Sequence, residues 1–188
     1  MNAGFRKTII LTGFVFIASF AIAQDKYFTK SGSIHFISKG AIETIQADNK
    51  SVTCVLDSKS GAIQFAVLLK GFEFKKALMQ EHFNENYVES DKFPKAEFRG
   101  QVVNNSDINY TKDGVYNAHV KGKLTLHGET KDVEADGKVT VKEGKLLTNS
   151  DFSIQMSDYN IRIPTLVKEN MSNTVDINVN CALEPLKG

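Results

Sequence analysis

Apolar and polar residues alternate with a period of two along most of the chain beyond Gly32. In one such run Ile63, Phe65, Val67 and Leu69 are apolar, and polar residues stand between and after them. This is the pattern of a β-strand with one dry face and one wet face. The same alternation is found in residues 116–126, 133–141, 152–156 and 175–183.

Short turn signals separate these runs, which indicates that neighbouring strands are antiparallel. The signals lie at residues 59–61, 112–114, 127–130 and 142–144. The pattern contains about eight strands whose dry faces need one shared interior, so it favours a closed antiparallel barrel, with a two-layer sandwich as the alternative. The chain is mainly β, and residues 24–188 are expected to form a single domain.

One segment interrupts the strand pattern with helical spacing. Phe74 and Leu78 lie four residues apart, and Met79, Phe83 and Tyr87 repeat that spacing. A proline at residue 94 ends the segment, because the residue before proline is pushed toward extended geometry. We predict a helix over about residues 74–89 that covers one opening of the barrel. The alternative is that its apolar stripe is ordinary core.

The N-terminus has the composition of a signal peptide. Arg6 and Lys7 precede an apolar run over residues 8–22, and residues 21–23 form a small-x-small cleavage pattern. The run is shorter than the roughly 20 residues of a membrane-spanning helix. We therefore predict a signal peptide over residues 1–23, a mature chain from Gln24 in the periplasm or secreted, and no membrane span in that mature chain.

The mature chain carries no feature that attracts a polyanion. Loss of Arg6 and Lys7 reduces the 23 basic residues to 21 against 22 acidic ones, so the formal charge changes from +1 to −1. No nucleic-acid partner is expected. The two cysteines, Cys54 and Cys181, both lie at apolar positions of predicted strands, where they could form a disulfide or remain as small buried thiols.

No catalytic motif is present in the sequence. There is no phosphate-binding GxxxxGK[ST], no GxSxG, no HExxH and no CxxC. The histidines His35, His82, His119 and His127 lack the spacing of metal ligands, and acidic pairs such as Glu81 with Glu85 are those of a solvated helix. We expect no enzymatic activity, no metal and no cofactor.

Several positions on the inward faces carry small residues, and these have two interpretations. Glycines in strands mark bends or close backbone approach, but small residues also leave volume for a ligand. An eight-stranded barrel is wide enough either to be filled by side chains or to hold one small ligand. The positions are Ala96, Gly100, Ala118, Gly122, Ala135 and Gly137.

Two segments, FEFKKALMQEHFNENYVESDKFPKAEFRG and GKLTLHGETKDVEADGKV, resemble in order and spacing the characteristic segments of the YceI-like family of secreted lipid-binding proteins. The first contains the helix followed by the FPKAEF strand start at Phe93. The second contains the hairpin pattern G-x-L-T-L-x-G-x-T-K from Gly122 to Lys131. The resemblance covers residues 32–183 and implies a lipocalin-like barrel, for some members with an isoprenoid chain in its interior. It implies no shared catalytic residue.

The leading hypothesis is a non-enzymatic carrier of an apolar lipid, a polyisoprenoid or an isoprenoid quinone. There are two alternatives. One is an outer-membrane barrel with its apolar face toward lipid, and the other is an enzyme acting on a lipid-like substrate. A homodimer is left open. The candidate ligand-contacting residues are Phe65, Val67, Leu69, Phe74, Leu78, Met79, Phe83, Tyr87, Phe98, Tyr116, Leu124 and Phe152.

Overall fold

The structure, a computed structural model, describes residues 25–164 and 172–186. The predicted signal peptide and its cleavage site lie outside these residues. The elements in chain order are β1 (Lys26–Lys39), β2 (Thr44–Asp57), β3 (Ala62–Leu68), η1 (Leu69–Gly71), β4 (Glu73–Phe74), α1 (Ala77–His82), η2 (Phe83–Tyr87), β5 (Lys95–Val102), η3 (Asn105–Asp107), β6 (Gly114–Leu126), β7 (Glu129–Lys142), β8 (Lys145–Gln155), η4 (Met156–Tyr159) and β9 (Thr174–Pro185).

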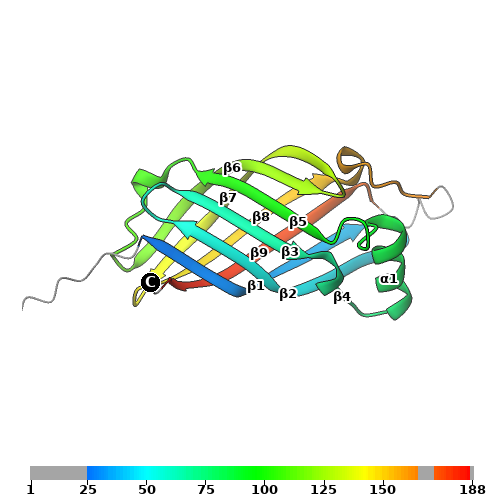
Figure 1. Ribbon diagram of the computed structural model, residues 1–188, viewed down its shortest axis with the longest axis horizontal. Coiled ribbons are helices and arrows are strands. Elements are labelled where there is room, and N and C mark those ends of the chain that lie inside the picture. The colour runs from blue at the N-terminus through cyan, green and yellow to red at the C-terminus, as the bar shows by residue number, and fades with distance from the viewer. Residues whose placement is uncertain (1–24, 165–171, 187–188) are drawn as a thin grey trace, which may run out of the picture.

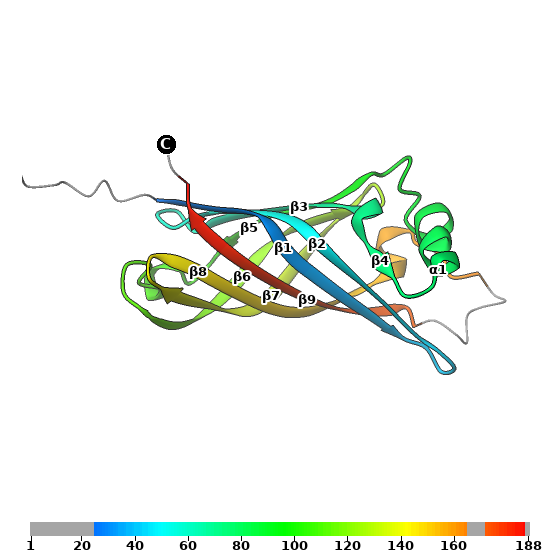
Figure 2. The same cartoon turned by 90° about the horizontal axis from the view of Figure 1, so that it is seen from below.

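The long strands close into an antiparallel barrel. The hydrogen-bonded order is β1-β9-β8-β7-β6-β5-β3-β2, and β1 also pairs with β2, which closes the circle of eight. The two-residue strand β4 is added to the side of β2. Figures 1 and 2 show an elongated barrel with α1 at one end and the C-terminus at the other. The predicted eight-stranded lipocalin-like barrel is confirmed.

Alternation along each strand separates an apolar interior from a charged outer wall. Phe65 on β3 and Phe98 on β5 are directly paired and meet edge to face inside, with ring centroids 6.2 Å apart. On the outer wall Lys121 of β6 and Glu134 of β7 form an exposed ion pair of 2.9 Å. An outer-membrane barrel, the alternative considered above, requires an apolar outer face toward lipid. The outer face of this barrel is instead charged.

The end of the barrel away from α1 is filled with side chains. Leu56, Leu146 and Leu183 are fully or almost fully buried there. The connection between β5 and β6 folds over this end and buries Ile108 and Tyr110. Burial, with the neighbouring Tyr27 as a smaller cause, raises the pKa of Tyr110 to about 12. This end is a packed core, and some of its side chains, Leu56 and Val102 among them, also border the cavity described below.

The helix at the other end is shorter than the sequence indicated. Phe74 is not helical but pairs with Ala47 of β2, and its backbone N–H donates to Gln80 Oε1 at 3.2 Å. The α-helix begins at Ala77 and continues into a π-helical turn that ends at Tyr87. The predicted start was wrong because apolar spacing in sequence does not show where pairing with a distant strand ends.

Some of the small inward residues allow close backbone approach, and others leave volume inside the barrel. Gly100 and Gly122 face each other across β5 and β6, and the ring of Phe98 lies over both. A Cβ on either would lie 2.6 Å from that ring and 2.5 Å from a neighbouring carbonyl oxygen, so these glycines allow close approach and leave no volume. Gly137 is also a site of close approach, since a Cβ there would lie 2.5 Å from the Asn149 carbonyl oxygen. By contrast, Ala96, Ala118 and Ala135 are small residues in the lining of the interior cavity described below.

The two cysteines are free and buried thiols. Cys54 is on β2 and Cys181 on β9, the two strands that flank β1. At Gly32 of β1 a Cβ would lie 2.5 Å from the Cys181 sulfur, so glycine leaves room for that thiol. The hydrogen bond between the two thiols and their burial raise the pKa of Cys54. The pair packs as two small buried thiols in this structure, and the disulfide stays a prediction.

Candidate functional site

A cavity of about 350 Å³ lies inside the barrel between the packed end and α1. Its size is at the lower end of the range for small-molecule sites. Strands from around the whole barrel contribute to its wall, including Phe65 from β3, Leu124 from β6 and Ile177 from β9. The α1–η2 segment and β4, which lie together at one end of the barrel in Figure 2, contribute Phe74, Met79, Phe83 and Tyr87 to the cavity border.

Most of the predicted ligand-contacting residues border this cavity. They are Phe65, Val67, Leu69, Phe74, Met79, Phe83, Tyr87, Phe98, Leu124 and Phe152. The inward orientation predicted for the strand residues in this set agrees with that position, as it does for Ile177. Their contact with a ligand stays a prediction.

Two of the predicted residues lie elsewhere. Leu78 is 61% exposed on α1, a helix in which no residue is buried. Tyr116 lies toward the packed end, where it contacts the core cluster and its hydroxyl donates to the Lys112 carbonyl at 3.0 Å. Neither residue is part of the cavity lining, and contact of either with a ligand stays a prediction.

A cluster of four phenylalanines forms the wall beneath the helix, and two of its members were missed. Phe83 of η2 stacks on Phe36 of β1 with centroids 5.8 Å apart, and contacts Phe72 and Phe74 at 5.6 and 5.1 Å. Phe36 continues the alternation of its strand with Ile34, which was the available signal. Phe72 lies in a short connection between η1 and β4, where no periodicity marks it.

Lys138, Glu43 and Glu97 are charged residues on the cavity border, and both carboxylates are partnered. Glu43 forms an ion pair of 2.7 Å with Lys76, and Glu97 forms one of 2.5 Å with Lys95. The hydrogen bond from Lys95 lowers the pKa of Glu97, which keeps that carboxyl ionised. The rest of the wall is mostly aliphatic and aromatic. Such a wall favours an apolar ligand, because each buried CH₂ contributes roughly 0.8 kcal/mol.

A histidine in the β6–β7 turn connects the segment after the helix to the barrel. His127 Nδ1 donates to the Tyr159 carbonyl at 3.0 Å, and Nε2 shares a hydrogen bond of 2.8 Å with Glu89 Oε2. The imidazole side chain is only 11% exposed and meets the Phe93 ring edge to face at 4.7 Å. Burial, with Asp158 as a smaller cause, raises the pKa of Tyr159 to about 12. Through these contacts the β6–β7 turn holds the end of the α1–η2 segment to the barrel.

We expect His127→Ala to lower the free energy of unfolding by about 1–3 kcal/mol, because it leaves a carbonyl and a carboxylate without their shared partner. Chemical denaturation measures this loss. His119→Ala is the matched control, since His119 pairs with Asp136 on the exposed outer wall and should cost less than about 1 kcal/mol. Equal losses in the two variants would contradict a structural role for the His127 contacts.

Across residues 25–164 and 172–186, no three His, Cys, Asp or Glu side chains are arranged to hold a metal ion. Within the same ranges, no helix has the length and hydropathy needed to cross a membrane.

Comparison with known proteins places the chain by sequence and by fold. The model of the YceI-like domain matches residues 23–183. No curated protein matches. Among solved structures, a polyisoprenoid binding domain from Saccharophagus degradans, implicated in plant cell wall breakdown, is 14% identical with a TM-score of 0.75, over 87% of this chain and 99% of that one.

Two other solved structures share the fold at similar distance. BcnA of Burkholderia cenocepacia is 15% identical with a TM-score of 0.66, over 81% of this chain and 95% of that one. The YCEI protein of Campylobacter jejuni is 13% identical with a TM-score of 0.54, over 100% of this chain and 94% of that one. At these identities the structures establish the barrel alone, while the family model covers nearly the whole described chain. The protein therefore belongs to the YceI-like family.

Proposed function

We propose that this protein binds an apolar lipid, a polyisoprenoid or an isoprenoid quinone, inside its barrel and carries it through an aqueous compartment without chemical change. The observation that carries the proposal is the apolar cavity of about 350 Å³, bounded by Phe65, Leu124 and Phe83 from three different parts of the chain. A linear apolar chain gains from every methylene that leaves water. Ordering costs keep the net affinity below that sum.

The fold neighbour described as a polyisoprenoid binding domain supports the choice of ligand class. The compartment is proposed from the sequence: a chain exported by its signal peptide would act in the periplasm or outside the cell. The intact mass of protein from a periplasmic fraction should equal that of a chain beginning at Gln24. A species that retains residues 1–23 would contradict export with removal of the signal peptide. The proposal places the ligand within one chain, and a homodimer stays an open prediction.

The ligand itself can be identified by mass spectrometry of organic extracts from natively purified protein. We expect a polyisoprenoid or isoprenoid quinone in amounts that approach one molecule per chain. A matched extract from the Leu124→Asp variant is the control, because a charge placed on the cavity wall should exclude an apolar chain. Recovery of no lipid from folded wild-type protein, or of equal amounts from both, would contradict the proposal.

A further inference from the structure

The barrel wall is incomplete between β7 and β8. Pairing of these strands runs from Lys142 opposite Lys145 to Asp136 opposite Asp151, and ends there. The strand β7 continues its pairing with β6 as far as Glu129, and β8 continues its pairing with β9 as far as Gln155. Within the described part of the chain, residues 130–135 and 152–155 therefore have a strand partner on one side only. We call these two facing stretches the β7–β8 seam.

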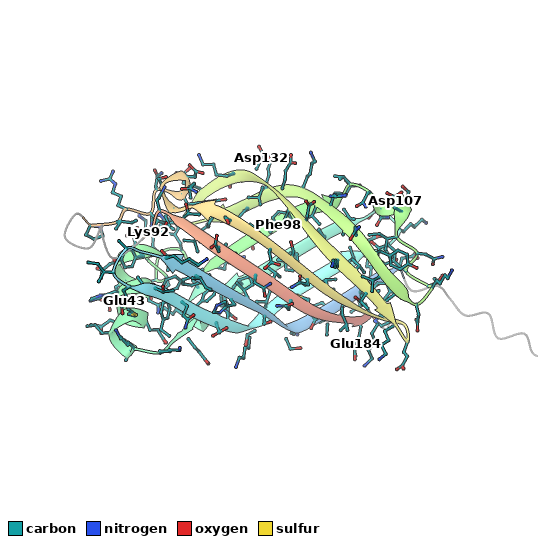
Figure 3. All side chains as sticks on the ribbon, turned by 180° about the vertical axis from the view of Figure 1, so that it is seen from behind. Glu43, Lys92, Phe98, Asp107, Asp132 and Glu184 are labelled. Carbon is teal, nitrogen blue, oxygen red and sulfur yellow. The ribbon has the colours of Figure 1, made fainter. Side chains whose placement is uncertain are left out.

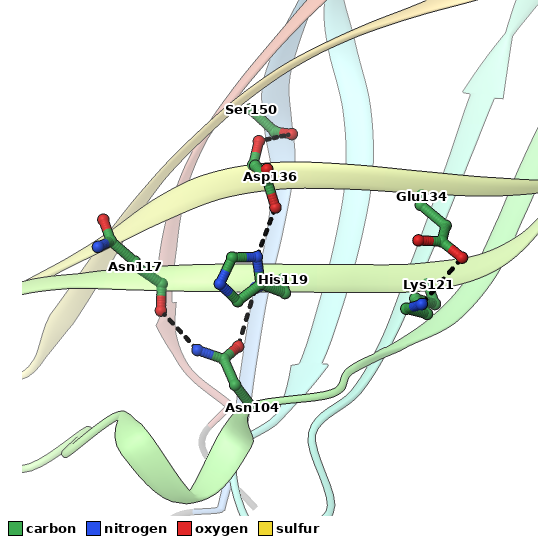
Figure 4. Close-up of polar contacts among 7 residues, drawn as sticks. All are labelled: Asn104, Asn117, His119, Lys121, Glu134, Asp136 and Ser150. Carbon is green, nitrogen blue, oxygen red and sulfur yellow. Dashed lines mark hydrogen bonds and ion pairs between the residues drawn. The ribbon is translucent and has the colours of Figure 1, made fainter.

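Polar side chains on the β7 edge of the seam form their hydrogen bonds with β6 and not with β8. Glu134 accepts from Lys121 of β6 at 2.9 Å, and Asp132 accepts from Lys123 of β6 at 2.8 Å. Figure 4 shows Glu134 and Asp136 directed in this way toward β6. These contacts hold β7 to β6 and do nothing to hold it to β8.

Polar side chains on the β8 edge of the seam likewise form their hydrogen bonds with the strand on the far side, β9. Ser153 donates to Asp176 of β9 at 2.8 Å, and Gln155 donates to Thr174 of β9 at 2.9 Å. Among the described residues, the β7–β8 ladder does not extend into the seam, and no side-chain hydrogen bond or ion pair joins its two sides. Widening the seam would thus break no ladder pairing, whereas parting two strands elsewhere in the barrel would break the hydrogen bonds of their ladder.

The seam is closed at both of its ends. At one end the Ser150 hydroxyl donates to the Asp136 carbonyl at 2.8 Å, where the ladder begins (Figure 4). At the other end Asn160, which follows η4, donates to Glu129 Oε1 at 2.7 Å. The seam is therefore a bounded gap in the ladder and not a frayed strand terminus.

The inward side chains of the seam border the cavity. They are Val133 and Ala135 on β7, and Phe152 and Ile154 on β8. Phe98 on β5, two strands along the barrel from β7, also borders the cavity and is labelled in the middle of the barrel in Figure 3. A chain that entered between β7 and β8 would therefore reach the apolar interior directly.

The helical end, by comparison, is fastened at several points. Lys76 before α1 pairs with Glu43 at 2.7 Å, and Asp91 after η2 pairs with Lys70 at 2.5 Å. The Glu89 contact with His127 and the four-phenylalanine cluster add to these. Moving this segment away would break all of them together and expose aromatic surface to water.

We propose that the apolar ligand enters and leaves sideways through the β7–β8 seam, while the α1–η2 segment stays in place as a fixed wall. The inference rests on the proposed function and adds the route by which the same cavity is loaded. It follows from the absence of ladder pairing across the seam, the apolar residues behind it and the number of contacts that hold the helix.

The test is to bridge each route and measure ligand exchange. In a Cys54→Ala/Cys181→Ala background, Glu134→Cys/Ser153→Cys places thiols on the outer wall, at the positions that would be opposite if the register of Asp136 with Asp151 continued. A bis-maleimide then bridges the seam without changing the cavity lining. Lys70→Cys/Asp91→Cys, treated with the same reagent, is the matched control at the helical end. Release of a dansyl-labelled geranylgeranyl chain into excess geranylgeraniol gives the exchange rate.

We expect the seam bridge to slow exchange by at least about tenfold with little change in equilibrium affinity, and the helical bridge to change the rate by less than about twofold. Monofunctional N-ethylmaleimide on the same cysteines should have no effect. Slowing by the helical bridge alone, by both bridges or by neither overturns the lateral route. Failure of the unbridged background to bind the probe is a different result, because it contradicts the proposed function itself.

Discussion

Leu146→Asp should leave the protein largely unfolded, while Leu147→Asp at the next position should leave its melting temperature almost unchanged. Leu146 is 0% exposed at the packed end of the barrel, and Leu147 is 47% exposed on the outer wall. An unpaired carboxylate at the first site costs more than about 4 kcal/mol, because the lost packing is added to the cost of a buried charge. A domain with about 5–15 kcal/mol of total stability has little left after such a loss.

The pair of variants differs in one property, the side of the wall on which the leucine stands. Far-UV circular dichroism and urea denaturation of both proteins measure the effect. At Leu147 we expect a change within about 1 kcal/mol, the span of strand propensities in a host protein. If the exposed site is the sensitive one, the inward and outward faces of β8 have been assigned the wrong way round.

Phe83→Ala should weaken ligand retention more than it weakens the fold. Phe83 is part of the four-phenylalanine cluster and borders the cavity, so part of the space it vacates adjoins ligand volume. We expect the ligand-free protein to lose less than the roughly 3–5 kcal/mol of a fully buried phenylalanine. Affinity should fall by about tenfold or more, equivalent to about 1.4 kcal/mol of lost apolar contact.

Thermal melts with and without geranylgeraniol separate the two effects, because a ligand that binds only the native state raises stability by mass action. Leu78→Ala on the same helix is the control, and its exposed side chain should matter to neither measurement. A Phe83→Ala protein that is strongly destabilised without ligand, yet gains as much from ligand as wild type, would show that the helix only plugs the barrel. The binding site would then lie deeper between the strands.

The strand faces were predictable because they depend on local alternation. Phe65, Phe98 and Phe152 stand two residues from other apolar positions in their own strands, and such spacing can only be buried on one side of a sheet. The hairpin from Gly122 to Lys131 carried both a turn and a family resemblance, and it lies where expected between β6 and β7.

The helical segment was less predictable, for a reason visible at two of its residues. Phe74 and Leu78 have the right spacing for one face of a helix. Phe74 instead pairs as a strand residue with Ala47 of β2, 27 positions earlier in the chain. Without Phe74 the helix starts at Ala77, and Leu78 turns outward. A pattern within one segment contains no information about a competing strand elsewhere in the chain.

The amino-acid sequence by itself determined that the chain is mainly β, which face of its most regular strands is dry and to which family it is similar, since all of these depend on neighbours along the chain. Only the tertiary structure decided where volume remains inside the barrel, how Glu89, His127 and Tyr159 meet, and where the β7–β8 ladder ends. These features depend on the register between distant strands and on the space that side chains leave when they pack, and both arise only when the barrel closes.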